Sequence, residues 1–366
     1  ILINQLRQRL PGMRLLLTNG TATGRAEGAS LLQPGDVQVW QPWDTPGAVK
    51  RFLRHFKPRI GVLLETEVWP NLAAACRQAG VPLVLANARL SEKSLRSALR
   101  LAWIAKPAYQ SLVAVWAQTE VGAQRFRRLR APVQAVLGNL KFDAKPDAAQ
   151  IAQGRAWRAG VGRPVILLAS SREGEEVQFL RMIQSFRAQS HVVSANDATE
   201  SIVNEFQWLI VPRHPQRFDE VAALITRDGL GLSRRSEWTA EPAPADVWLG
   251  DSLGEMALYY GLADVALLGG SFEPLGGQNL IEAAACGCPV VMGPSTFNFA
   301  QAARLAEAAG AAIRSDSMAQ ALQTAMALVR DAQGRAAMAE RATGFAAAHQ
   351  GAADKTADAV VALLKR

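Results

Sequence analysis

The chain has 366 residues, 49% of them hydrophobic and 20% charged, a balance that fits two globular domains and excludes a disordered chain. Its formal net charge of +8 is compatible with an anionic partner such as nucleic acid, a membrane surface or a phosphorylated substrate. Three cysteines, Cys76, Cys286 and Cys288, are too few and too oddly spaced for a disulfide framework or a zinc site. No Asp-x-Asp signature of a metal site is apparent near the predicted strand ends, and we expect no metal and no cofactor.

Short apolar runs alternate with amphipathic segments along the first half of the chain. The sequence begins at Ile1 in a pattern typical of the middle of a helix, and we expect a segment that precedes it. We predict strands at residues 14–19, 60–66, 82–87, 113–118 and 134–139. Such runs, rich in Leu, Val and Ile and separated by helices, are typical of parallel strands covered on both faces.

One segment of the first half, residues 93–109, has the pattern of an amphipathic helix. Leu95, Leu99 and Trp103 share one face, and basic residues occupy the others. This pattern is typical of a helix that lies on an anionic membrane, and equally of a helix that covers a sheet. We expect no nucleic acid partner, because no helix-turn-helix, zinc finger or aromatic stacking motif accompanies the basic residues.

The strand pattern pauses in a polar stretch near residue 145 and restarts at Pro164. We predict further strands at residues 164–170, 191–196, 207–213, 247–251, 265–270 and 289–294, followed by an Ala-rich helical end. Alternation of this kind predicts two doubly wound, Rossmann-like α/β domains, residues 1–145 and 146–366, with a cleft between them. Ligands of such sheets bind at the carboxyl ends of the strands.

The densest signal is "GGSFEPLGGQNLIEAAACGCPVVMGP" at residues 269–294. A strand ends in glycines, which let backbone approach a ligand closely, and a helix is predicted to begin near Asn279. The start of a helix attracts anions, phosphate above all, and Glu282 is placed to accept hydrogen bonds from sugar hydroxyls. The alternative is that Asn279 and Glu282 form a capping box and only start the helix.

Three other strand ends of the second half carry polar residues. Arg213 and His214 lie between two prolines, and arginine binds phosphate through two parallel hydrogen bonds. Residues 251–255 read as a strand end at Asp251 followed by a helix cap, and residues 169–176 carry two serines, an arginine and a glycine. Four such loops are better explained by one bound nucleotide than by four separate accidents.

The first half carries a different set of strand-end residues. Glu65 and Glu67 follow one strand, Asn87 and Arg89 follow the next, and residues 19–24 form a small hydroxyl-rich loop. These groups fit a sugar or phosphate acceptor, although each by itself is more often part of a solvated loop.

Taken in order, several strings resemble the 3-deoxy-D-manno-octulosonic acid (Kdo) transferases of Gram-negative lipopolysaccharide synthesis. The matching strings are "ETEVWPN", "LANARLSEKS", "GNLKFD", "SREGEE", "VPRHPQRF", "GDSLGEMALYYGLADVALLGGSF", "GGQNLIEAAACGCPVVMGP" and "TFNF". The resemblance implies a GT-B glycosyltransferase that transfers Kdo from CMP-Kdo to a lipid A precursor with inversion and without a metal. It also implies a location at the cytoplasmic face of the bacterial inner membrane, against an anionic surface.

The resemblance assigns residues to the two substrates. The CMP-binding set is Pro212, Arg213, Leu253, Gly254, Glu255, Asn279, Leu280, Ile281 and Glu282, and the acceptor side includes Glu65, Glu67 and Arg89.

Two departures from the family pattern stand out. Ala22 replaces a proline of the family's hydroxyl-rich loop, which makes that loop less rigid. The family's general base, a glutamate, is expected before Ile1 together with a membrane anchor, so no catalytic residue is assigned in this chain. Two alternatives remain: a GT-B enzyme that uses another nucleotide sugar, and a non-catalytic relative that binds CMP or lipid A.

Overall fold

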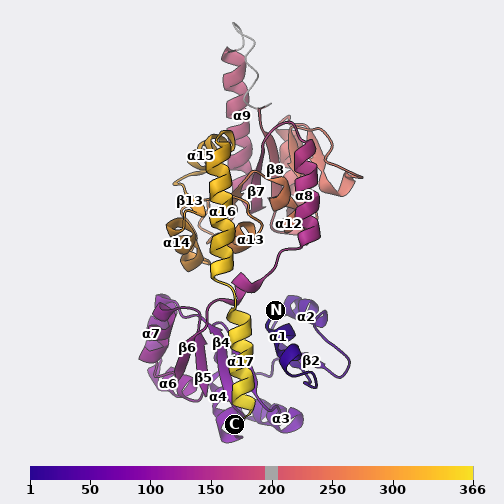
Figure 1. Cartoon of the computed structure of the whole chain (residues 1–366). Coiled ribbons are helices and arrows are strands. Elements are labelled where there is room, and N and C mark those ends of the chain that lie inside the picture. The colour runs from indigo at the N-terminus through magenta and orange to yellow at the C-terminus, as the bar shows by residue number, and fades with distance from the viewer. Residues whose placement is uncertain (194–204, 366) are drawn as a thin grey trace. The chain divides into compact units, whose positions relative to one another are not determined.

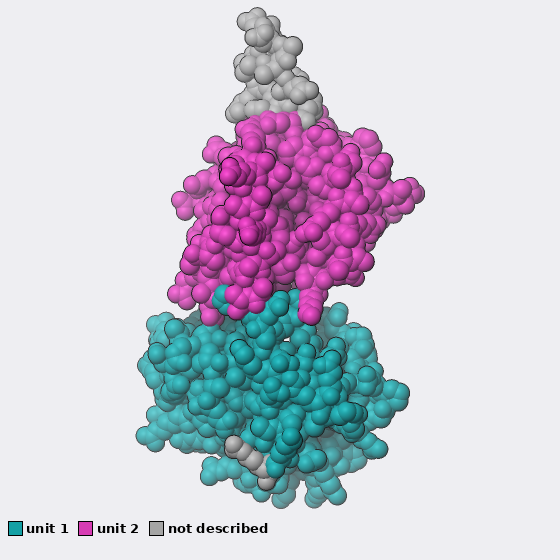
Figure 2. All heavy atoms as spheres, in the orientation of Figure 1, with its two compact units in different colours: residues 1–144, 349–366 teal, residues 145–348 magenta. Residues whose placement is uncertain are grey.

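The computed structural model describes residues 1–193 and 205–365 and divides into two compact units (Figures 1 and 2). The N-terminal unit comprises residues 1–144 and 349–366, and the C-terminal unit comprises residues 145–348. The first crossing between the units falls in the polar stretch where the sequence predicts a domain boundary. The last residues differ from the prediction, because 349–366 belong to the N-terminal unit and not to the second domain.

The N-terminal unit contains two parallel sheets. One pairs β1 (Leu16–Asn19) with β2 (Val37–Trp40), and the other has the order β3 (Gly61–Leu64), β4 (Leu83–Ala88), β5 (Ala114–Ala117), β6 (Val133–Val136). The helices are α1 (Leu2–Arg9), α2 (Ala22–Ala29), α3 (Pro46–Phe56), α4 (Pro70–Gln78), α5 (Glu92–Arg100), α6 (Ala102–Gln110), α7 (Glu120–Arg128) and the 3₁₀ turn η1 (Leu140–Asp143). Strand β2 was missed by the sequence reading, because its four residues are half exposed and lack a continuous apolar run.

The last helix, α17 (Ala352–Leu364), completes the N-terminal unit (Figure 1). Its Val360 is buried in a cluster with Val84 and Trp116 of the sheet, and Leu363 packs against the same cluster. Asp143 caps the start of the helix, since its carboxylate accepts hydrogen bonds from the N–H groups of Gly351 and, at 2.6 Å, Ala353. An apolar face and a distant cap thus place this helix, and neither is visible in its own Ala-rich composition.

The C-terminal unit is built on one seven-stranded parallel sheet with the order β13-β12-β11-β7-β8-β10-β9. The strands are β7 (Val165–Ser171), β8 (Gln207–Pro212), β9 (Leu232–Arg234), β10 (Val247–Leu249), β11 (Val265–Leu268), β12 (Val290–Met292) and β13 (Ala312–Arg314). The chain enters at β7, extends the sheet on the β8 side, and then returns to add β11 on the other side. The topological switch point therefore lies between β7 and β11, the place where such sheets bind ligands.

Helices cover both faces of this sheet. They are α8 (Ala148–Gly160), α9 (Glu175–Val193), α11 (Phe218–Arg227), α12 (Met256–Leu262), α13 (Leu280–Ala285), α14 (Ala300–Ala308), α15 (Met318–Arg330) and α16 (Ala332–Ala348), with 3₁₀ turns η2 (Pro215–Arg217) and η3 (Arg235–Glu237). The predicted strand at 191–196 is wrong for residues 191–193, which end α9, and its other residues lie outside the described ones. The sequence does not predict strands β9 and β13, which are short, partly buried and without a continuous apolar run.

The two units differ in how deeply their strands are buried. All six residues of β8 and all four of β11 are buried, and β7 is buried at six of seven positions. In the N-terminal unit β4 and β5 are buried throughout, whereas β1, β2, β3 and β6 are half buried or exposed. Among the described helices, none is both long and apolar enough to cross a membrane.

Candidate functional site

The carboxyl ends of β7, β8 and β11 meet at the switch point. The N–H of Arg213 donates to the carbonyl of Ser171 at 3.0 Å, so β8 continues to pair with β7 just past its last residue. On the other side Gly269 lies directly against β7, because a Cβ there would come within 2.3 Å of the Ser170 carbonyl oxygen. Ser170 itself has a φ of +55°, an uncommon conformation for a residue other than glycine, at a strand end that carries candidate ligand-binding residues.

Two consecutive buried glutamates at the start of α9 hold these strand ends together. The Glu175 carboxylate accepts hydrogen bonds from the N–H groups of Arg172, Gly270 and Phe272 at 2.9, 2.7 and 3.0 Å. Burial raises the pKa of Glu175, and the three N–H donors oppose that shift. Glu175 therefore fixes the glycine loop after β11 to the end of β7.

Glu176 does the same for the loop after β8. Its carboxylate accepts a hydrogen bond from the Ser171 hydroxyl at 2.7 Å and pairs with Arg217 at 2.6 Å. Burial raises the pKa of Glu176, while the hydroxyl and the guanidinium favour its ionised form. Neither glutamate was singled out from the sequence, although the string "REGEE" directly after a buried strand is a signal that pointed to them.

Arg213 and Glu282 form the part of the site that is open to a ligand. Arg213 is exposed and has no ion pair within residues 1–193 and 205–365. Glu282, in α13, is partly buried, and burial raises its pKa while the charge of Arg213 opposes that shift. The two side chains are thus close enough to interact, one from the end of β8 and one from the helix after the glycine loop.

Four other residues of the predicted CMP-binding set lie at the end of β8 and at the start of α13. Pro212, Leu280 and Ile281 are buried, so the two aliphatic side chains belong to the core. Asn279 caps α13 by accepting a hydrogen bond from the Ile281 N–H at 3.3 Å. Helix α13 has only six residues, so its dipole is weaker than that of a long helix.

The loop after β10 is held rigidly. Asp251 pairs with Arg234 at 2.8 Å and accepts hydrogen bonds from the N–H and hydroxyl of Ser236. The Glu255 carboxylate pairs with Arg235 at 2.8 Å and accepts a hydrogen bond from Ser252. The expected helix cap at Ser252 is therefore wrong, because Ser252 binds the Glu255 side chain and α12 begins only at Met256.

The tip of this loop is exposed to solvent. Leu253 is 68% exposed, and Gly254 has a φ of +78° and accepts a hydrogen bond from the Gln150 side chain at 3.0 Å. Because the Glu255 carboxylate is already committed to Arg235 and Ser252, the residues free to meet a ligand here are Leu253 and Gly254.

In the N-terminal unit the predicted acceptor residues lie at the ends of β3 and β4. Glu65 has a φ of +63°, its carbonyl accepts a hydrogen bond from the Arg89 N–H at 3.0 Å, and its carboxylate lies 3.8 Å from Lys141. Glu67 is exposed in the following loop. Lys141 was missed as a site residue, although "GNLKFD" was recognised as a matching string.

Asn87 and the loop at residues 19–24 have structural roles. Asn87 is buried, has a φ of +50°, and accepts a hydrogen bond from the Leu140 N–H at 3.1 Å. Thr21 caps α2 through the N–H of Gly24 at 3.1 Å. The side chain of Asn87 is thereby occupied in joining the end of β4 to η1.

The segment read as one amphipathic helix is two helices, α5 and α6, that break at Leu101. Leu95 is fully buried in the core of the N-terminal unit, so the apolar face of α5 covers the sheet. Leu101 and Trp103 are exceptions, with 56% and 77% of their surface exposed. This part of the segment remains available for an apolar partner.

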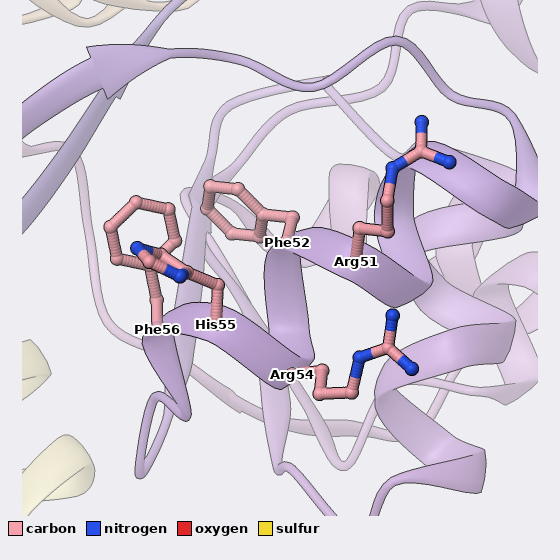
Figure 3. A pocket seen from close by; sticks show the side chains of 5 residues that line it. All are labelled: Arg51, Phe52, Arg54, His55 and Phe56. Carbon is pink, nitrogen blue, oxygen red and sulfur yellow. The ribbon is translucent and has the colours of Figure 1, made fainter.

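A second exposed aromatic region lies on and before α3. A shallow pocket there is lined by Arg51, Phe52, Arg54, His55 and Phe56, and Figure 3 shows the two guanidinium groups on one side and the three rings on the other. Trp43, which precedes α3, is 85% exposed. The neighbouring Asp44 accepts hydrogen bonds from the N–H groups of Asn71 and Leu72 in α4 at 3.1 and 2.8 Å, which fixes this segment.

Within the described part of the chain, no three His, Cys, Asp or Glu residues are grouped so as to hold a metal ion. All three cysteines are free and buried.

Comparisons with known proteins relate the chain to one family. The family model described as "3-Deoxy-D-manno-octulosonic-acid transferase (kdotransferase)" matches residues 1–144. The chain is 48% identical to the 3-deoxy-D-manno-octulosonic acid transferase of Bordetella pertussis, over 98% of this chain and 82% of the relative. It is 28% identical to the enzyme of the same name from Haemophilus influenzae, over 100% and 84%.

A solved structure also supports the fold. The UDP-GlcNAc 2-epimerase of Neisseria meningitidis bound to UDP-GlcNAc superposes with a TM-score of 0.60 at 14% identity, over 100% of this chain and 95% of that one. At this identity the likeness concerns the fold alone. The predicted GT-B class with two Rossmann-like units is confirmed, and the cleft between them stays a prediction.

Proposed function

The chain belongs to the family of 3-deoxy-D-manno-octulosonic acid transferases, and on that premise we propose that it transfers Kdo from CMP-Kdo to a lipid A precursor and releases CMP. The reaction is a glycosyl transfer in which an acceptor hydroxyl attacks the anomeric carbon and the CMP phosphate leaves. The phosphate gains charge as it leaves, so a positioned cation accelerates the step.

The observation that carries the donor half of the proposal is Arg213. It stands at the end of β8 beside the switch point, exposed and without an ion pair among the described residues. An unpaired guanidinium at this place is suited to a phosphate. Glu282, which feels the charge of Arg213, is suited to accept hydrogen bonds from the ribose hydroxyls, and Leu253 and Gly254 present an apolar tip and an open backbone.

A metal is not required by this proposal. CMP-Kdo contains a single phosphate, and its charge is met by Arg213 without the metal that diphosphate sugars commonly need. The deprotonation of the acceptor hydroxyl is a general-base step, and we assign it to no residue of this chain.

For the acceptor we propose the ends of β3 and β4 in the N-terminal unit. Glu65, Glu67 and Arg89 are joined there by Lys141, which lies 3.8 Å from the Glu65 carboxylate. These charged groups suit the phosphates and hydroxyls of a phosphorylated glucosamine disaccharide. The positive φ of Glu65 supports a functional reading, because strain of this kind gathers at binding sites.

We further propose that the N-terminal unit lies against the cytoplasmic face of the inner membrane. Trp43 and Trp103 are exposed, and Arg51 and Arg54 accompany the aromatic pocket of α3. Exposed tryptophans and arginines on one unit favour the interface of an anionic bilayer. The acceptor is a lipid, so an enzyme that acts on it must reach the membrane surface.

The test of the activity is a transfer assay with the full-length protein. Kdo, CTP and a Kdo-activating synthetase supply CMP-Kdo, and mass spectrometry follows a tetra-acylated lipid A precursor. We expect a gain of one or more Kdo units, and a rate about 100-fold lower for Arg213→Ala, in line with the loss of a charged hydrogen bond. The matched control is Arg181→Ala, an exposed arginine of α9.

Three outcomes would contradict the proposal. A preference for a UDP-sugar would favour another GT-B activity, and tight CMP binding without transfer would favour a non-catalytic relative. An Arg213→Ala variant as active as Arg181→Ala would remove Arg213 from the donor site.

A further inference from the structure

Arg172 and Arg213 form a pair at the ends of neighbouring strands. Ser171 of β7 pairs in register with Pro212 of β8, and the next N–H along β8, that of Arg213, donates to the Ser171 carbonyl at 3.0 Å. The residues that follow these partners, Arg172 and Arg213, therefore leave the sheet side by side at the same edge. The strand register itself thus places two arginines at one corner of the sheet.

The position of Arg172 is fixed more firmly than that of an ordinary loop residue. Its N–H donates to the buried Glu175 carboxylate, which also binds the N–H of Gly270. The Arg172 side chain runs past Gly270, since a Cβ at that glycine would lie 3.6 Å from the Arg172 Cγ. Arg172 thus extends across the glycine loop at the switch point between β7 and β11.

Neither of the two arginines is held in a buried ion pair within the described residues. Arg172 pairs with Glu173 at 3.1 Å, but Glu173 is 57% exposed, and such surface pairs contribute little. Arg213 has no ion pair within the described ranges. His214 lies beside both, and burial together with the charges of Arg172 and Arg213 lowers its pKa, which keeps the imidazole neutral near pH 7.

In the proposed function the phosphate is assigned to Arg213, which leaves Arg172 without an assigned partner in the donor. The donor in the proposed function is an ulosonic acid, a sugar whose anomeric carbon bears both the phosphate oxygen and a carboxylate. Its two anionic groups are therefore close neighbours, as are the two arginines. Each arginine can bind one of them through two parallel hydrogen bonds.

We propose that Arg172 binds the carboxylate of the donor sugar while Arg213 binds the phosphate. This inference rests on the proposed function and assigns a specificity-determining residue within it. The carboxylate is unchanged when the bond from the anomeric carbon to the phosphate oxygen breaks and the acceptor oxygen takes its place. Arg172 therefore binds ground state and transition state alike, and its loss raises KM more than it lowers kcat.

The experiment compares CMP with CMP-Kdo in four variants of the full-length protein. The variants are Arg172→Gln, Arg172→Lys, Arg213→Gln and the control Arg181→Gln. Calorimetry gives the Kd of CMP, which lacks the carboxylate, and the coupled transfer assay gives kcat and KM for CMP-Kdo formed in place by the synthetase.

For Arg172→Gln we expect a KM for CMP-Kdo about 10- to 100-fold higher, in the range of one lost charged hydrogen bond, with the Kd of CMP changed by less than about threefold. Arg172→Lys should recover part of the loss, because it restores the charge but not the paired hydrogen bonds. Arg213→Gln should weaken CMP and CMP-Kdo together.

Equal weakening of CMP and CMP-Kdo by Arg172→Gln would overturn the inference, because Arg172 would then act on the phosphate or on the fold. A KM equal to that of Arg181→Gln would also overturn it. In both cases the wild-type protein still transfers Kdo, so the proposed function stands. Failure of the wild-type protein to bind CMP or transfer Kdo would instead remove the proposed function and this inference with it.

Discussion

The strand ends of the two units are built in different ways. In the C-terminal unit, buried carboxylates tie the loops together: Glu175 and Glu176 are fully buried, and Asp251 binds Arg234 and Ser236. In the N-terminal unit the corresponding residues are more open, with Glu67 and Arg89 exposed and the Glu65–Lys141 pair 3.8 Å apart. The strand ends of the C-terminal unit are held by buried carboxylates, whereas those of the N-terminal unit carry exposed charged residues.

This difference has a physical meaning for the two substrates. A buried carboxylate that accepts several N–H bonds holds its loops in a single geometry, as a site for a small charged nucleotide requires. An edge of exposed charges, with Trp43 exposed in the same unit, can accommodate a larger and more variable partner. In the proposed function, the rigid edge is assigned to the small donor and the open edge to the lipid acceptor.

The largest expected effect comes from removing the central tie. Glu175→Ala leaves one buried and two part-buried N–H donors without an acceptor, and we expect the free energy of unfolding of the C-terminal unit to fall by about 3 kcal/mol. Urea titration followed by circular dichroism measures this. The neighbouring Glu173→Ala, which removes an exposed carboxylate, should change it by less than about 0.5 kcal/mol.

If Glu175→Ala and Glu173→Ala were equally stable, the buried tie would not be what holds the C-terminal loops. The contrast between the units would then have to rest on the depth of strand burial alone.

A smaller loss of stability is expected in the N-terminal unit when Asp143, which caps α17, is replaced. Asp143→Ala removes the acceptor for the N–H groups of Gly351 and Ala353, and we expect a loss of about 1–2 kcal/mol in the free energy of unfolding. Asp358→Ala, which breaks only an exposed pair with Arg9, serves as the control and should cost less than half as much. If both variants lost the same free energy of unfolding, the cap would contribute no more to stability than an exposed ion pair.

The three cysteines allow the two units to be compared in one sample. Burial raises the pKa of Cys76 to about 11 and that of Cys286 to about 12, and it also raises the pKa of Cys288. At pH 8 all three thiols should react slowly with iodoacetamide, since the thiolate is the reactive form. In mild urea we expect Cys76, in the less deeply buried unit, to be alkylated about 10-fold faster than the other two.

Mass spectrometry of peptides after timed alkylation measures these rates. Faster labelling of Cys286 and Cys288 would reverse the expected order of stability.

The smallest effect on stability is expected at the open surface. Trp43→Ala should leave the free energy of unfolding within about 0.5 kcal/mol of wild type, because 85% of the side chain is exposed. It should nevertheless weaken sedimentation with anionic phospholipid vesicles about threefold or more. Val113→Ala, another exposed apolar residue of the same unit, is the control, and equal binding by both variants would exclude Trp43 from the membrane surface.

The sequence predicted long buried strands and the motifs at their ends, because continuous apolar runs and glycine-rich turns are local signals. It missed β2, β9 and β13, which are short and only partly buried and therefore lack a continuous apolar run. The predicted CMP residues include Arg213, which the structure leaves open, but also Glu255, whose carboxylate is bound by Arg235 and Ser252. Whether a strand-end carboxylate serves a ligand or a neighbouring loop depends on distant residues, and a local motif does not contain them.

The place of α17 has a consequence for the order in which the two units can fold during synthesis. Translation delivers residues 1–144 first, yet the unit they form is completed by residues 349–366, including the Val360 side chain in its core and the N–H groups that Asp143 binds. On the ribosome the C-terminal unit therefore has all of its own residues before the N-terminal unit does. Residues 1–144 are synthesised before residues 145–348, yet their unit can complete its folding only after residues 349–366 have been made.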